Sequence, residues 1–209
     1  MHVSAFSLNL SNSAWRIAPV AALLLTCGCA APNSALLPDI DTRETRTLVL
    51  AALDDWQFYG RIAVRSEIDG FNGKLRWTQD QNKFSATASG PLGAGAIRIE
   101  GDDASVVLTD KDGIRTVLED AEAELQVRYG WTIPVASLRY WALGIPDPGA
   151  PADTIFDENG QLERLRQRGW SVIISSYAEG GGQLMPRVLT AENADTRVRL
   201  VIDHWVFFD

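Results

Sequence analysis

The chain has 209 residues, of which 46% are hydrophobic and 22% charged, a composition that excludes disordered, collagen-like and low-complexity proteins. Its length suits one domain with a sizeable core. A formal net charge of −8 argues against nucleic acid as the main partner, because polyanions select basic proteins. The chain has only two Cys and two His, so metal centres and Cys- or His-based catalysis have few residues to draw on.

Residues 1–28 are predicted to be a lipoprotein signal peptide. Ile17–Leu25 is an apolar run behind a basic flank, and it is too short to span a bilayer. It leads into Leu25-Thr26-Cys27-Gly28-Cys29, which resembles a bacterial lipobox, the motif whose Cys receives a diacylglycerol. Cys29 is a better acceptor than Cys27 because a small glycine precedes it. An ordinary signal peptide with two incidental cysteines is the alternative.

Residues 29–38 are predicted to be the lipidated Cys and a tether, and residues 39–209 the folded domain. Cleavage before Cys29 leaves one Cys and one His in the mature chain, so a disulfide framework within it is excluded. The residue after Cys29 is Ala30 rather than Asp. By analogy with enterobacterial sorting, this favours the outer over the inner membrane.

The folded part begins with a predicted helix over Asp39–Asp55, with Leu48, Ala51, Ala52 and Leu53 on its apolar side. The hydrophobic period then changes from that of a helix to two, which is typical of half-buried antiparallel strands. Turn signals such as Asp-Gly and Lys-Asp-Gly separate these runs. The runs lie at Gly60–Arg65, Lys74–Thr78, Phe84–Ser89 and Ile97–Glu100.

Two further helices are predicted at Leu118–Tyr129, before Gly130, and from Pro134 to Gly144. Strand patterns then return at Gln161–Gln167, Trp170–Tyr177, Arg187–Glu192 and Thr196–Phe208. The sequence therefore predicts an α+β domain. An antiparallel sheet of about ten short strands would curl, and about three helices would cover its concave face.

The sequence alone does not settle the role of two features of the predicted sheet. Its inner face includes small residues, which we place at Ala63, Ala86, Ala88 and Ala96. Alternation alone does not distinguish a filled interior from a ligand cavity. The loop 89–95 carries Leu92 at its centre without polar company, although loop tips are usually polar. Leu92 therefore either packs back into the core or protrudes.

The order of these motifs resembles the outer-membrane lipoprotein receptor family LolB over essentially residues 40–208. The most specific stretch is Ile133–Pro146, with the sequence IPVASLRYWALGIP. The lipobox, the Gly60–Val64 strand, Pro91-Leu92-Gly93 and the terminal Ile202–Trp205 strand add to the resemblance.

The resemblance implies a half-open, incomplete antiparallel β-barrel whose helices cover a hydrophobic cavity. Such a protein accepts acylated lipoproteins from the periplasmic carrier LolA and inserts them into the outer membrane. It uses no cofactor, no metal and no catalytic residue. It implies that Leu92, with Pro91 and Gly93, is directed into the membrane. Cys29 would anchor a monomer in the inner leaflet of the outer membrane, facing the periplasm.

The cavity residues are not fixed by a motif of the family. Strand parity and helix face predict that acyl chains contact Leu75, Trp77, Ile97, Ile99, Leu138 and Trp141. One alternative function is a passive outer-membrane lipoprotein that binds another apolar ligand or scaffolds envelope assembly. A second is an envelope hydrolase that uses a carboxylate pair. Its candidate carboxylates are Asp102, Asp103, Asp153, Asp157 and Asp203, most of which lie in predicted turns, where Asp is expected for backbone reasons.

Overall fold

A computed structural model of the chain describes residues 2, 34–40, 42–90, 96–102 and 104–208. The chain divides into two compact units, Met1–Asn33 and Ser34–Asp209, and every described helix and strand lies in the second. The predicted signal peptide, Cys27, Cys29 and the loop residues Pro91, Leu92 and Gly93 lie outside the described residues. Among those that are described, no helix is long and apolar enough to cross a membrane.

The second unit is built on one antiparallel sheet of eleven strands that does not close. The strand order is β6-β5-β4-β3-β2-β1-β11-β10-β9-β8-β7, so pairing of the first strand with the last joins two meanders. The strands are β1 (Asp55–Ser66), β2 (Gly70–Asp80), β3 (Lys83–Ser89), β4 (Ile97–Gly101), β5 (Val106–Thr109), β6 (Arg115–Leu118), β7 (Asp153–Phe156), β8 (Leu162–Gln167), β9 (Trp170–Gly180), β10 (Gln183–Glu192) and β11 (Thr196–Phe207).

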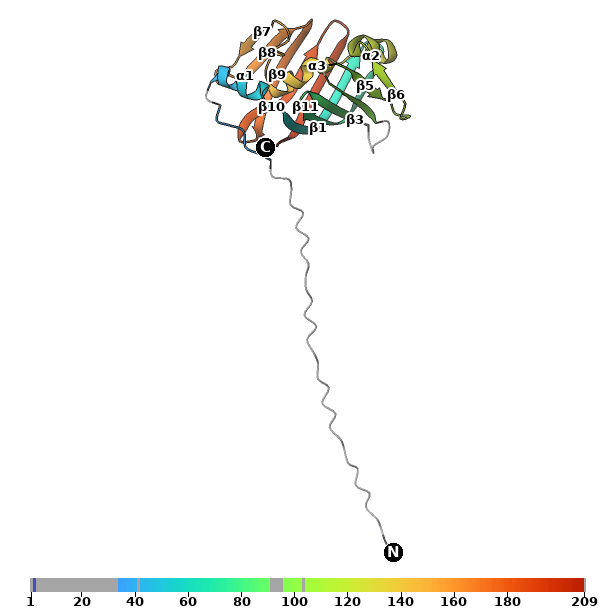
Figure 1. The fold of residues 1–209 in the computed structure, drawn as a ribbon, viewed down its shortest axis with the longest axis horizontal. Coiled ribbons are helices and arrows are strands. Elements are labelled where there is room, and N and C mark those ends of the chain that lie inside the picture. The colour runs from blue at the N-terminus through green and yellow to red at the C-terminus, as the bar shows by residue number, and fades with distance from the viewer. Residues whose placement is uncertain (1, 3–33, 41, 91–95, 103, 209) are drawn as a thin grey trace. The chain divides into compact units, whose positions relative to one another are not determined.

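Three helices, α1 (Arg43–Ala51), α2 (Ala121–Tyr129) and α3 (Val135–Leu143), lie over one face of this sheet (Figure 1). The side chains of Thr42 and Asp120 accept hydrogen bonds from backbone N–H groups of the first turns of α1 and α2. Gly130 and Gly144 end α2 and α3 in the left-handed conformation, which glycine adopts without strain. The predicted α+β class, with a half-open antiparallel sheet and three helices, is therefore confirmed.

Aromatic side chains fill the interior where β1, β2, β3 and β11 meet. Trp77 is 1% exposed, and its ring stacks on Trp56 at 6.3 Å and on Phe84 at 5.4 Å between centroids. Phe58 and Trp205 belong to the same group, and their ring centroids are 5.3 Å apart. Large rings on neighbouring strands thus pack this part of the barrel solidly.

The structure corrects the prediction for the first helix. The helix is shorter than predicted, and β1 already begins at Asp55. Leu48, predicted to be on the apolar side, is 73% exposed, while Leu50 and Arg46 are the buried residues of α1.

Other boundaries also differ from those predicted. Leu118 ends β6, and α2 begins only at Ala121. Ala63 and Ala96, predicted to face inward, cannot share a face with the inward side chains next to them, because neighbouring strand residues point to opposite sides. The strands β5, β6 and β7 were not predicted from the sequence.

Candidate functional site: an apolar cavity beneath the helices

An apolar cavity lies between the sheet and the segment 131–138, which we call the roof. The roof comprises the chain from Trp131 to Pro134 and the first turn of α3. Every side chain around the cavity is apolar. The lining residues are Ile62, Phe71, Leu75, Trp77, Ala86, Ala88, Ile97, Ile99, Trp131, Ile133, Val135 and Leu138.

Small residues on β3 make room for this cavity. Ala86 and Ala88 lie opposite Trp77 and Leu75 of β2 and opposite Ile99 and Ile97 of β4. A methyl group in each of these positions leaves unfilled the space that a larger side chain would occupy. The cavity volume is about 40 Å³, which is far less than one acyl chain needs. A long apolar ligand would therefore have to displace part of the lining.

Five of the six predicted cavity residues lie at the wall of this cavity, namely Leu75, Trp77, Ile97, Ile99 and Leu138. Trp141 lies elsewhere: its indole N–H donates to Gln167 Oε1 at 2.9 Å, and its ring packs against Trp170. The prediction lacked the roof residues Trp131, Ile133 and Val135. The alternation of apolar residues at 131, 133 and 135 was the available signal, but it lies between two helices and matches no helical face.

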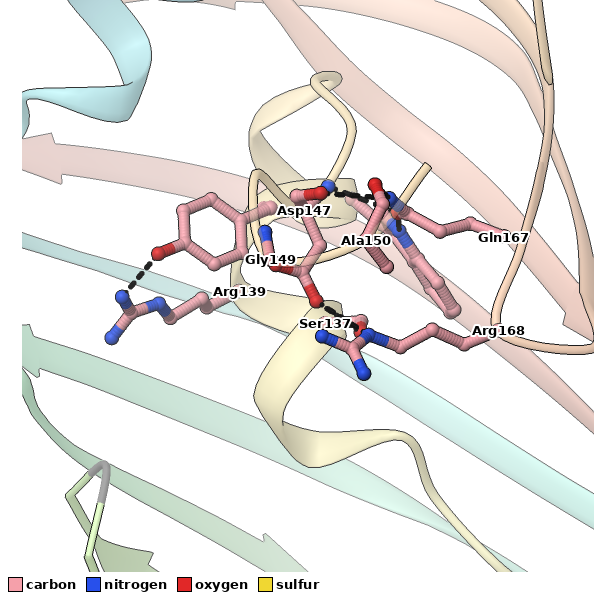
Figure 2. Close-up of polar contacts among 9 residues, drawn as sticks. Ser137, Arg139, Asp147, Gly149, Ala150, Gln167 and Arg168 are labelled. Atoms are coloured by element: carbon pink, nitrogen blue, oxygen red, sulfur yellow. Dashed lines mark hydrogen bonds and ion pairs between the residues drawn. The ribbon is translucent and has the colours of Figure 1, made fainter. Parts of the chain in front are cut away.

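A largely buried polar cluster ties the first turn of α3 and the loop after this helix to the β8–β9 hairpin (Figure 2). The Asp147 carboxylate accepts hydrogen bonds from Ser137 Oγ at 2.8 Å, from the Gly149 N–H at 2.8 Å and from Arg168 Nε at 2.9 Å. Gln167 bridges the same loop, because its amide donates to the carbonyls of Asp147 and Ala150.

The turn between β8 and β9 contains Arg168, the cation of this cluster. Arg168 has a φ of 49° and is followed by Gly169 at 78°, the pair of positive φ angles that a type I′ hairpin turn requires. Burial, the largest single influence, raises the pKa of the Asp147 carboxyl. The hydrogen bonds from Gly149, Ser137 and Arg168 together outweigh it, so the pKa lies below its ordinary value.

The roof's other end is held more weakly. The Thr132 N–H donates to Thr196 Oγ1 at 3.2 Å, and Thr132 Oγ1 donates to the Glu122 carbonyl at 3.0 Å. Neither bond involves a charged group, so each contributes less than the bonds to Asp147. The polar attachments of the roof are thus stronger at its α3 end than at Trp131–Ile133, where the two apolar side chains are held by burial.

Three of the carboxylates considered for catalysis serve turns or an ion pair, and a fourth, Asp153, is exposed at the start of β7. Asp102 Oδ1 accepts from the N–H groups of Ala104 and Ser105, and Asp157 Oδ1 likewise binds backbone N–H groups of its own turn. Asp203 pairs with Arg61 at 2.9 Å. Asp103 lies outside the described residues. Within the described part of the chain, no group of three or more His, Cys, Asp or Glu side chains is placed to hold a metal ion.

Comparison with known proteins places this geometry in context. A family model described as "Outer membrane lipoprotein LolB" matches residues 54–205. A protein named "Outer-membrane lipoprotein LolB" from Nitrosococcus oceani is 35% identical over 187 residues, covering 88% of this chain and 92% of its own. Proteins of the same name from Pseudomonas aeruginosa and Stutzerimonas stutzeri are each 37% identical, over 88% and 90% of this chain and 92% and 93% of their own.

Among solved structures, the fold is similar to a putative outer membrane lipoprotein-sorting protein domain from Vibrio parahaemolyticus. The TM-score is 0.50 at 8% identity, and the match covers 79% of this chain and 88% of the other. At this identity the likeness concerns the fold alone.

Proposed function

The chain belongs to the family of outer-membrane lipoproteins LolB, and from this premise we propose that it receives acylated lipoproteins and inserts them into the outer membrane. The donor in this proposal is the periplasmic carrier LolA. The observation that carries the proposal is the cavity, which is walled only by apolar side chains. Acyl chains need such surroundings because each methylene that is exposed to water costs about 0.8 kcal/mol.

Uptake then requires the roof to rise. The asymmetry of its attachments favours movement at Trp131–Ile133, while the Asp147 cluster holds the α3 end in place. Lifting Trp131, Ile133 and Val135 would remove one wall of the cavity and expose the sheet residues below it. The acyl chains would replace these side chains as packing partners of the sheet.

Transfer from the carrier needs no chemical energy. If the cavity binds the acyl chains more tightly than the carrier does by about 1.4 kcal/mol, transfer is biased tenfold in the forward direction. Less than two additional buried methylenes would supply this difference at about 0.8 kcal/mol each. A receptor of this kind works by the shape and apolar character of its site, without a nucleophile or cofactor.

Two residues outside the described part of the chain complete the proposal. Cys29 would carry the lipid that anchors the protein in the inner leaflet of the outer membrane, and Leu92 would enter the membrane from the loop between β3 and β4. That loop joins Ser89, the last residue of β3, to Ile97, the first of β4. An exposed Leu entering an apolar phase gains up to about 2 kcal/mol.

The test uses the chain from residue 30 onward, which contains every described helix and strand. It is mixed with a carrier–lipoprotein complex and lipid vesicles, and the lipoprotein is followed by flotation. We expect lipoprotein to move first onto this protein and then to the vesicles. Leu92→Glu should still accept lipoprotein but deliver it poorly. The matched control is Ile114→Glu, which changes a 62% exposed aliphatic residue in another hairpin and should deliver normally.

The same assay separates the alternative functions. A passive lipoprotein or a scaffold would bind an acylated peptide, if at all, without removing lipoprotein from the carrier. Failure to accept lipoprotein from the carrier would therefore contradict the proposed function. Normal delivery by Leu92→Glu would contradict only the role of the loop.

A further inference from the structure

The outward face of β1, β2 and β11 is strongly basic, although the whole chain carries a net charge of −8. These three strands are neighbours at the centre of the sheet. Their outward side chains include six cations, all exposed, which we call the basic face. They are Arg61, Arg65, Lys74, Arg76, Arg197 and Arg199.

The strand register places like charges directly opposite each other. Arg61 of β1 faces Lys74 of β2, and Arg65 of β1 faces Arg197 of β11. Like charges in directly opposite positions destabilise an antiparallel pair. Each of these pairs therefore needs a counter-charge, which either an acid of the protein or an external anion can supply.

The anions of the protein itself neutralise only part of this charge. Asp203 pairs with Arg61 at 2.9 Å, and Glu192 pairs with Arg197 at 2.7 Å. The remaining four cations make no ion pair with any residue that the structure describes; they are Arg65, Lys74, Arg76 and Arg199.

The unpaired charge is concentrated at one part of the face. Two acidic residues, Glu67 and Asp69, lie in the β1–β2 turn that follows Arg65. Arg76 lies over the ring of Tyr59 at 5.5 Å. Lys74 and Arg199, by contrast, lie on either side of β1, with Arg61 between them in the sheet order.

An open groove of about 370 Å³ lies among these three cations. It is also lined by Asn72 and Ser89, whose amide and hydroxyl groups are hydrogen-bond donors, and by the apolar residues Ile62, Ala63 and Val201. Because Arg61 is paired with Asp203, Lys74 and Arg199 are the cations of the groove without an ion pair among the described residues. A guanidinium, an ammonium group and neutral donors around one groove form the set that recognises phosphate oxygens.

We propose that the basic face binds the anionic headgroups of a phospholipid bilayer, with the groove taking a headgroup phosphate. Cations spread over three strands match a surface of many phosphates better than one small ligand. The inference rests on the proposed function in one respect: the groove wall includes Ser89 and Gly90, which lead into the loop whose Leu92 is proposed to enter the membrane. Headgroup binding would hold this edge of the sheet at the bilayer while the loop inserts.

The test measures binding of the chain from residue 30 onward to two kinds of vesicle, pure phosphatidylcholine and phosphatidylcholine mixed with phosphatidylglycerol. We expect tighter binding to the anionic vesicles, and weaker binding to them as salt rises. The double variant Lys74→Gln/Arg199→Gln should lose about 25-fold in affinity for them, at roughly fivefold per cation. Its loss of affinity for the neutral vesicles should be much smaller, because the choline cation offsets the phosphate charge of phosphatidylcholine.

The control variant is Arg164→Gln/Arg166→Gln, which removes two exposed arginines of β8 from the same side of the sheet, three strands from β11. It should bind like the unaltered protein. Equal binding of the unaltered protein to both vesicles, or an equal loss in the control, would overturn the inference. So would displacement from the vesicles by low concentrations of inorganic phosphate, which would indicate a site for a small anion.

The vesicle-binding test of the basic face can fail or succeed independently of the lipoprotein-transfer test of the proposed function. The Lys74/Arg199 double variant should still take lipoprotein from the carrier in solution, whereas Leu92→Glu should weaken binding to both kinds of vesicle. Should the double variant lose carrier binding and keep its vesicle binding, the basic face would belong to a protein partner and the inference would be wrong. Charge-dependent vesicle binding without any uptake of lipoprotein would support the inference and contradict the proposed function.

Discussion

Replacing Ala86 by Leu should block the cavity without disturbing the fold. Ala86 lines the cavity from β3, and its neighbours on the flanking strands are Trp77 and Ile99. Leu carries three more carbons than Ala, and each would take the place of roughly one methylene of a bound acyl chain. At about 0.8 kcal/mol per methylene, the loss is about 2.4 kcal/mol, or roughly 50-fold in affinity.

A titration with a fluorescently labelled acylated peptide measures this loss. The matched control is Thr87→Leu, the next residue on β3, whose side chain points to the opposite face of the sheet. It should bind the peptide normally. The free energy of unfolding of Ala86→Leu should change by no more than about 1–2 kcal/mol, because the added atoms enter space that is already free. Unchanged peptide binding by Ala86→Leu, or the same loss in Thr87→Leu, would refute the assignment of this cavity to acyl chains.

Further predictions concern the attachments of the helices. Asp147→Ala should lower the free energy of unfolding by about 2–3 kcal/mol in urea titrations, and Arg168→Ala by only about 1 kcal/mol, since its side chain is 45% exposed. Because the pKa of Asp147 is lowered on folding, its contribution should be complete above about pH 3.9 and decline as pH falls towards the lowered pKa; a pH series that shows no such decline relative to Asp147→Ala would contradict this. Arg46→Met should change the free energy of unfolding by less than about 1 kcal/mol, because the buried guanidinium has one N–H without a hydrogen-bond partner. A larger loss would show that the hydrogen bond of Arg46 to Leu184 stabilises the fold by more than burial of the charge destabilises it. In native-state hydrogen exchange the Thr132 amide should exchange faster than that of Asp147, and the reverse order would place the weak end of the roof at α3.

The strands were largely predictable because one face of the sheet is buried and the other is exposed. Leu75 and Trp77 of β2 are buried while Lys74 and Arg76 are exposed, which is the alternation that the sequence displays. Short strands such as β7, with only four residues, carry too few positions for this signal. Arg46 was not predictable for another reason. Hydropathy treats arginine as a surface residue, but here the Arg46 guanidinium donates to the Leu184 carbonyl at 2.6 Å inside the core.

The cavity was expected only from the family resemblance, and its lining was predicted only in part. Helix α3 buries six of its nine residues, among them Leu138, Trp141 and Leu143, so hydropathy cannot say which of them faces the cavity. In the structure Trp141 points away from the cavity, because its indole N–H donates a hydrogen bond to Gln167 of β8, 26 residues away in the chain. Such a pairing depends on the tertiary structure and leaves no periodic trace in the sequence.

The same contact explains why the roof can serve as a movable part. A helix that is buried on nearly all sides cannot leave the sheet as a whole without exposing most of its apolar surface, which costs about 25 cal/mol per Å². The bonds of Trp141, Ser137 and Asp147 add a polar attachment to that end, whereas the Trp131–Ile133 segment has two neutral hydrogen bonds. Opening at the weaker end exposes the cavity walls while the core around Trp141 stays packed. The proposed opening is thus confined to the Trp131–Ile133 end of the roof, where its cost is mainly the exposure of the buried Trp131 and Ile133 side chains.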